Sequence, residues 1–152
     1  MCLCARFSLH DRVGTKALGR MRPLVASIVD MVARRAARSP VAGDPVGRAA
    51  AFLDRDGTVI KDTHYLDDPE RVELIPGANH AIRRLTEAGL AVVLVTNQAG
   101  IARGLYSEAD YVRVAERLDQ VMHAVGIRVD GTYYCPHHPD HGGPCYCRKP
   151  GT

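Results

Sequence analysis

Two aspartates separated by a single residue are the strongest chemical feature of the sequence. Asp54 and Asp56 follow the apolar run at residues 49–53, and Gly57 comes directly after them. In an extended segment residues i and i+2 project to the same side, so both carboxyl groups can address one ion while Gly57 lets the chain turn sharply. Oxygen ligands of this kind suit Mg²⁺. A second interpretation stays open here, because Asp-Gly is a common turn dipeptide and either aspartate could merely cap a turn.

A second group of candidate ligands lies near the end of the sequence and consists of Cys135, His137, Cys145 and Cys147. Two close pairs of thiol and imidazole donors across a short loop can surround Zn²⁺ tetrahedrally. Four protein ligands leave no open coordination position, so the predicted zinc is structural and holds the loop that precedes Arg148 and Lys149. The alternatives are a disulfide between two of the cysteines, unliganded thiols, and a ligand role for His138 or His141 in place of His137.

The composition is that of a globular protein and excludes several functional classes. The chain has 152 residues, of which 46% are hydrophobic and 24% charged, and no apolar run approaches the roughly 18 residues of a membrane span. The net charge of +3 is uneven, because residues 1–50 carry nine Arg and Lys against three Asp and the remainder carries eleven against fourteen acids. Basic residues are therefore too sparse on the main body to predict a nucleic-acid-binding face. We expect neither a nucleic-acid nor a membrane partner.

The first third of the chain differs from the rest. Residues 1–48 are predicted to be a basic, disordered extension, with a weakly amphipathic stretch at 24–32 and a Pro/Gly-rich linker at 39–47. An organelle transit peptide and a start codon assigned too far upstream are alternatives. Charged residues interrupt the place where a signal peptide would have its apolar segment, so we expect a cytoplasmic protein with reduced thiols. The folded unit is expected at residues 49–152.

The elements that must position the candidate residues alternate between strand and helix. Apolar runs predict strands at residues 49–53, 90–95 and 131–134. One helix is expected between Pro76-Gly77 and Gly89. The clearest helix starts at a capping box formed by Ser107 and Asp110 and ends at Gly126.

This order of elements predicts an α/β fold with a parallel sheet, right-handed crossovers and strands buried on both faces. Ligands of such sheets bind beyond the carboxyl ends of the strands. Polar residues stand at those positions: Asp54 and Asp56 after the first strand, Thr96 and Asn97 after the second, and Arg148 and Lys149 after the third. We expect these groups to converge on one crevice.

Several segments resemble one known family. Residues 52–58, FLDRDGT, resemble the DxDGT signature of the haloacid dehalogenase (HAD) superfamily of phosphohydrolases, Thr96 resembles the hydroxyl of its second motif, and Lys149 the lysine of its third. Residues 96–104, 133–139 and 145–150 resemble the corresponding segments of heptose 1,7-bisphosphate phosphatases. The resemblance spans residues 51–151. It implies a HAD-like Rossmannoid three-layer sandwich with a parallel sheet and a zinc-binding loop.

The resemblance also implies roles for individual residues. Asp54 would be the nucleophile that accepts the phosphoryl group, and Asp56 would act as general acid and then general base. Thr96 and Lys149 would bind the phosphoryl oxygens. Catalytic Mg²⁺ would be held by Asp54 and Asp56. The residues aligned with the family's substrate contacts are Asp62, Thr63, His64, Tyr65, Asn97, Gln98, Ala99 and Arg148.

The activity implied is hydrolysis of the 7-phosphate of D-glycero-D-manno-heptose 1,7-bisphosphate, a small phosphorylated sugar, by an enzyme that is monomeric in its complete form. Histidinol-phosphate phosphatase and a catalytically inactive zinc-binding fragment are the alternatives. The family's fourth motif, an acidic pair that supplies a further Mg²⁺ ligand, has no match before Thr152. We therefore expect the domain to be incomplete at its C-terminus and the chain as written to be a weak catalyst or none.

Overall fold

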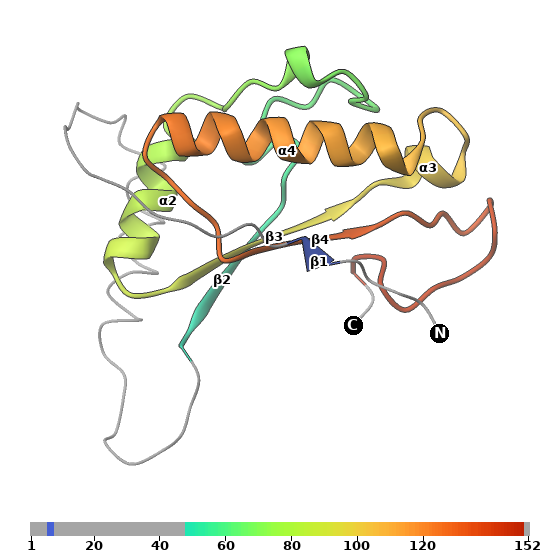
Figure 1. Cartoon of the computed structure of the whole chain (residues 1–152). Helices are drawn as coiled ribbons and strands as arrows, with labels where there is room; N and C mark the ends of the chain where they lie inside the picture. Colours follow the sequence, from blue (N-terminus) through green and yellow to red (C-terminus); the bar gives the residue numbers. More distant parts are fainter. Residues whose placement is uncertain (1–5, 8–47, 151–152) are drawn as a thin grey trace.

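A computed structural model of the chain describes residues 6–7 and 48–150 (Figure 1). Its elements, in chain order, are β1 (Arg6–Phe7), β2 (Ala50–Leu53), η1 (Pro69–Arg71), α2 (Ala78–Glu87), β3 (Ala91–Asn97), α3 (Ala99–Ala102), α4 (Glu108–Ala124) and β4 (Gly131–Cys135). The stretch 24–32 and the linker 39–47 named above lie outside the described residues. Among the described helices, none is long and apolar enough to cross a membrane.

The strands form one sheet in the order β1-β4-β3-β2. β2 pairs with β3 and β3 with β4 in parallel, so the expectation of a parallel sheet built from the three apolar runs is confirmed. Leu53 is opposite Leu94, and Asn97 is opposite Cys135. The carboxyl ends of the strands therefore meet at one edge of the sheet. Sequence reasoning missed the antiparallel β1, whose two residues are too short for any periodic signal.

Helices α2 and α4 lie on the same face of the sheet, with α4 running across it (Figure 1). The order β2-β3-β4 steps in one direction across the sheet, so crossovers of the same hand place both helices on one side. The main core lies between these two helices and the sheet. It combines Ile82 and Leu85 of α2, Val92 and Leu94 of β3, and Val114, Leu118 and Met122 of α4. The described residues thus form a sheet with one helical layer, two of the three layers that the resemblance implies.

The strands are buried on one face rather than on both, contrary to the sequence-based expectation. Along β3 the residues Val92, Leu94 and Thr96 are buried while their neighbours are only half-buried, and in β2 the side chain of Phe52 is 70% exposed. The cause is the one-sided placement of α2 and α4, because no described helix covers the other face. Continuous apolar runs therefore predicted strands correctly but overstated their burial.

Short-range signals set the helix boundaries. The expected capping box is present at the start of α4, where Ser107 accepts from the Asp110 backbone and the Asp110 carboxylate accepts from Ser107. The side-chain hydrogen bond from Ser107 lowers the pKa of Asp110. Gly89 and Gly126 follow the two long helices with φ of +86° and +72°, a conformation that glycine adopts without strain.

Arg48, the last residue of the predicted extension, contacts the folded unit. Its guanidinium donates to the carbonyl oxygens of Gly89 (2.9 Å) and Leu90 (2.5 Å) and pairs with the Asp130 carboxylate (2.8 Å). These contacts tie the entry of β2 to the segments that precede β3 and β4.

Candidate active site

Asp54 follows β2 directly and stands at the carboxyl edge of the sheet. One carboxylate oxygen, Oδ1, accepts a hydrogen bond from the Arg55 backbone N–H (2.8 Å) and pairs with the ammonium group of Lys149 (2.8 Å). The other oxygen, Oδ2, takes no part in these contacts, and half of the side chain is exposed. The carboxylate is therefore oriented by two donors while one oxygen stays available to a ligand.

Asp56 is surrounded by donors. Its Oδ2 accepts hydrogen bonds from the Thr96 hydroxyl (3.0 Å) and the Gln98 amide (3.0 Å), and the Arg55 guanidinium approaches both carboxylate oxygens. Thr96 and Gln98 are buried at the end of β3 and just beyond it. The parallel register of β2 and β3 thus brings the second aspartate against the hydroxyl that the sequence assigned to the same site.

Gln98 is held in turn by Tyr106. The phenol donates to the Gln98 side-chain oxygen (2.6 Å), which leaves the amide nitrogen to face Asp56 and Thr96. Burial raises the pKa of Tyr106 to about 12, so the phenol stays a donor at neutral pH. Gly100 makes room for the ring, since a Cβ at this position would lie 2.1 Å from a Tyr106 ring carbon.

Lys149 reaches the site from the far end of the described chain. Its backbone N–H donates to the Asn97 side-chain oxygen, and the Asn97 amide donates to the Lys149 carbonyl, both at 3.1 Å. The ammonium group also donates to the Val95 carbonyl (2.5 Å). These bonds fasten the segment after the cysteines to the end of β3, and so place a cation beside Asp54.

A groove of about 230 Å³ opens beside these groups. It is lined by seven of the residues singled out from the sequence, namely Asp56, Asp62, His64, Tyr65, Asn97, Gln98 and Ala99, together with Arg55, Leu66 and Tyr106. His64 and Tyr65 both have positive φ, 49° and 51°, in a loop where the Asp62 carboxylate accepts from the His64 backbone. Thr63 and Arg148 do not line this groove; Arg148 instead donates to the His137 carbonyl (3.2 Å).

The four predicted zinc ligands come together in space. The ligand atoms of Cys135, His137, Cys145 and Cys147 all lie within 4.8 Å of one another. The Sγ atoms of Cys135 and Cys147 are 3.3 Å apart, and those of Cys135 and Cys145 are 3.5 Å apart. Ligands on a tetrahedral zinc with Zn–S bonds of about 2.3 Å would be separated by roughly 3.8 Å. The cluster therefore has nearly the dimensions of a tetrahedral site.

The neighbouring histidines have other surroundings. The imidazole of His138 contacts the Arg103 guanidinium (2.9 Å) and the ring of His141. His137, in contrast, turns its Nδ1 towards the Sγ of Cys147 (3.3 Å). Among the described residues, Cys135, Cys145 and Cys147 form no disulfide, and burial raises the pKa of the Cys135 thiol. Of the imidazoles weighed from the sequence, the geometry favours His137 as the fourth ligand.

Sequence reasoning missed the roles of Arg55 and Tyr106 in the site. Arg55 lies between the two aspartates, so strand alternation directs its side chain to the opposite side, towards the helices. A charged residue at such an inward-facing position was the available signal. Tyr106 carried no such signal, because its contact with Gln98 depends on how the loop after α3 folds back.

Comparison with known proteins defines the class. Residues 51–129 match the family described as haloacid dehalogenase-like hydrolase, and the chain belongs to this family. It is 45% identical over 106 residues to the D-glycero-beta-D-manno-heptose-1,7-bisphosphate 7-phosphatase of Yersinia pestis, an alignment that covers 66% of this chain and 56% of the relative. The enzyme of the same name from Escherichia coli K12 is 43% identical with the same coverage. The chain thus spans just over half the length of these curated relatives.

Solved structures show the same likeness. The D,D-heptose 1,7-bisphosphate phosphatase from B. bronchiseptica, complexed with magnesium and phosphate, is 41% identical with a TM-score of 0.60, over 67% of this chain and 56% of that one. A HAD-like structure from Mesorhizobium loti is 39% identical with a TM-score of 0.62 over 68% of this chain and 51% of its own. Both likenesses support the HAD-like fold expected from the sequence.

Proposed function

We propose that this chain carries the catalytic groups of a phosphatase that hydrolyses the 7-phosphate of D-glycero-β-D-manno-heptose 1,7-bisphosphate through an aspartyl phosphate. The observation that supports it most is the Asp54 carboxylate, which is fixed through Oδ1 by Lys149 and the Arg55 backbone and offers Oδ2 at the sheet edge beside Asp56. The relatives at 43–45% identity supply the substrate, because their names specify it.

The chemistry divides into two displacements. Asp54 Oδ2 forms a bond to phosphorus while the bond from phosphorus to the sugar oxygen breaks, and Asp56 gives its proton to that oxygen. Water then attacks the aspartyl phosphate, Asp56 takes the proton of the water, and inorganic phosphate leaves with Asp54 regenerated. Lys149 lies 2.8 Å from the Asp54 carboxylate and so can neutralise charge that gathers on the phosphoryl oxygens. The Thr96 hydroxyl is the second group proposed for this task.

Asp54 and Asp56 are the residues proposed to hold Mg²⁺. The donor set fits a hard cation, since both residues supply carboxylate oxygens and the Asp54 side chain is half exposed at the sheet edge. When bound, the ion would add positive charge next to the transferring phosphoryl group. Thr96, Lys149 and the two aspartates would form the reacting end of the site, and the groove lined by Asp62, His64, Tyr65, Asn97 and Ala99 would receive the sugar.

The Cys135, His137, Cys145 and Cys147 cluster is proposed to bind one structural Zn²⁺. Closing this set around the ion would fix the segment that delivers Lys149 to Asp54. Zinc in this role contributes to folding and not to the reaction. Reduced thiols suit such a site, and we propose the cytoplasm as its compartment.

A parallel phosphate-release assay tests the proposal. Purified chain is supplied with Mg²⁺ and Zn²⁺ and given either heptose 1,7-bisphosphate or histidinol phosphate, with Asp54→Asn as the background. We expect slow, Mg²⁺-dependent release above that background, faster with the heptose. A preference for histidinol phosphate would replace the substrate assignment, and release no faster than the Asp54→Asn background with either compound would refute the activity.

A further inference from the structure

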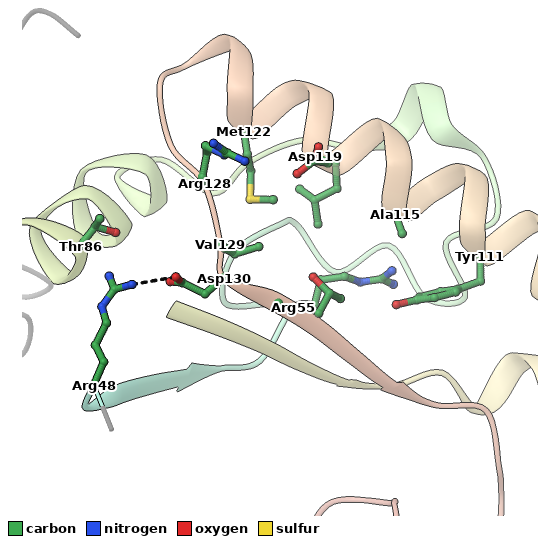
Figure 2. Close-up of a pocket in the computed structure, with 13 residues that line it drawn as sticks. Arg48, Arg55, Thr86, Tyr111, Ala115, Asp119, Met122, Arg128, Val129 and Asp130 are labelled. Carbon is green, nitrogen blue, oxygen red and sulfur yellow. Dashed lines mark hydrogen bonds and ion pairs between the residues drawn. The ribbon is translucent and has the colours of Figure 1, made fainter. Parts of the chain in front are cut away.

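Arg55 is a charged side chain in the interior of the molecule. Only 2% of it is exposed, and it lies beneath α4 with its guanidinium directed towards Tyr111 (Figure 2). The guanidinium carbon is 5.5 Å from the centroid of the Tyr111 ring. A buried cation costs several kcal/mol of solvation unless it is paired, so its retention inside the core requires a compensating role.

The partner of this cation is Asp56, and the contact is made through two nitrogens. Nε lies 3.1 Å from Oδ1 and 3.2 Å from Oδ2, and Nη2 lies 2.9 Å from Oδ1. Thr96 and Gln98 both donate to Oδ2 only. Among the described residues, Arg55 is therefore the one side chain that holds Oδ1 of this carboxylate.

The remaining nitrogen of the guanidinium, Nη1, has no hydrogen-bond partner within the described part of the chain. It belongs to a side chain that lines a cavity of about 310 Å³ between α4 and β4, where Asp119 and Thr132 also face the space. A polar cavity of this size has room for water that could hydrate Nη1. Arg55 lines this cavity and the substrate groove as well, so it forms part of the wall between the two.

We propose that Arg55 is a positioning residue for the reaction, one that fixes the plane of the Asp56 carboxyl group from behind the active site. This inference rests on the proposed function, in which Asp56 transfers the proton. Without the guanidinium, Thr96 and Gln98 would hold the carboxylate by Oδ2 alone, and Oδ1 would pivot about that point. Proton transfer requires hydrogen-bond distance and alignment, so such a pivot slows the reaction, and Arg55 acts on it through Asp56.

The competing interpretation is a purely structural Arg55 that fills the core beneath Tyr111. The two can be separated by kinetics, because a structural role lowers the amount of folded protein, whereas a positioning role lowers kcat per folded molecule and leaves KM almost unchanged. The variants are Arg55→Met, which keeps the length of the side chain but no donor, and Arg55→Lys, which keeps one charged donor. Arg113→Met is the control, because Arg113 pairs with Asp110 on the exposed surface of α4.

We expect Arg55→Met to lower kcat by about a hundredfold, since a displacement of about 1 Å at a reacting group has an effect of this size. Arg55→Lys should recover part of the loss, because its ammonium can reach Oδ1 but cannot bridge both oxygens. KM should change little in either variant, and Arg113→Met should match the unmodified chain. A folded Arg55→Met protein with unchanged kcat would overturn the inference.

A measurement on the unmodified side chain keeps the test independent of folding and of activity. In the NMR spectrum of the 152-residue chain, the Arg55 Nε–H should exchange slowly with solvent, and Asp56→Asn should shift its resonance and speed the exchange. An Nε–H that exchanges as fast as that of Arg113, or that does not respond to Asp56→Asn, would refute the positioning contact. Absence of phosphate release by the unmodified chain would count against the proposed function, and the Nε–H signal would then decide the contact separately.

Discussion

The aspartate pair and the cysteine loop are positioned by different means. Asp54 and Asp56 follow a strand of the sheet, and their partners Thr96 and Gln98 are buried side chains at the end of the neighbouring strand. In residues 136–150, by contrast, no residue is buried, and Tyr146 is 92% exposed. The first region takes its shape from the core of the domain, whereas the second has no buried residue, and we propose that metal binding by its Cys and His cluster stabilises it.

The two regions meet at Lys149. This residue belongs to the exposed loop segment, yet its ammonium group pairs with Asp54 and its backbone is bonded to Asn97. Changes in the sheet-edge site should therefore leave the loop intact, whereas changes in the loop should reach the site.

Asp54→Asn should have the largest effect on chemistry and the smallest on structure. An amide cannot form an aspartyl phosphate, so phosphate release should disappear. The Asp54 side chain is half exposed, so the substitution should change the free energy of unfolding by less than about 0.5 kcal/mol. Phosphate release and urea denaturation of the same preparation check both points. A large loss of stability would show that the carboxylate also maintains the fold.

Cys145→Ser, unlike Asp54→Asn, should act first on the structure of the loop and only through it on the reaction. We expect the metal content measured by elemental analysis to fall from one zinc per chain towards zero, because a hydroxyl replaces one of four tetrahedral ligands. Limited proteolysis should then cut the segment 136–148, while the far-UV circular dichroism of the sheet and helices stays the same. Phosphate release should decline as Lys149 loses its position. Zinc retained at one per chain in this variant would exclude Cys145 as a ligand.

Sequence reasoning was most effective where a signal is local. The apolar runs predicted the strands, Ser107 and Asp110 predicted the start of α4, and the rule for parallel sheets predicted that Asp56 and Thr96 would meet. The first two predictions depend on residues that are neighbours in the sequence, and the third depends on the fact that parallel strands have their carboxyl ends at the same edge of the sheet. For the same reason, the close pairs of Cys and His could be recognised as one cluster.

Contacts that depend on long-range folding could not be foreseen. The reciprocal bonds between Asn97 and Lys149 join residues 52 positions apart, and the exposure of Phe52 depends on which face of the sheet the helices occupy. The resemblance implies a substrate contact for Gln98, which lines the groove. The bonds of its side chain to Asp56, Thr96 and Tyr106 could not be foreseen from the sequence.

Gly100→Ala should have an intermediate effect, confined to the sheet-edge site. The added Cβ would lie 2.1 Å from the Tyr106 ring, so the ring must move, and overpacking of this kind costs about 1–3 kcal/mol of stability. Loss of the Tyr106 bond to Gln98 should also lower phosphate release. Gly131→Ala is the matched control, because its Cβ would meet Tyr133 at an ordinary 3.5 Å. Zinc content should stay unchanged in both variants, and equal destabilisation by the two would contradict the role of Gly100.

The smallest effect concerns the start of α4 and its dependence on pH. The Asp110 carboxylate accepts from the Ser107 hydroxyl and backbone and contacts Arg113, and these interactions lower the pKa of Asp110 below its ordinary value of 3.8. A lowered pKa means that the capping box stabilises the folded protein above pH 4 and that this contribution is lost as the pH falls through the pKa of the folded state.

Amide hydrogen exchange in the first turn of α4 should therefore accelerate, relative to the rest of the helix, when the pH is lowered from 6 towards 3. Ser107→Ala removes the leading hydrogen bond and should reduce this pH dependence, whereas Asp119→Asn, in the middle of the same helix, should preserve it. If amide exchange in the first turn and amide exchange in the middle of α4 change in parallel at every pH, the capping box contributes nothing measurable.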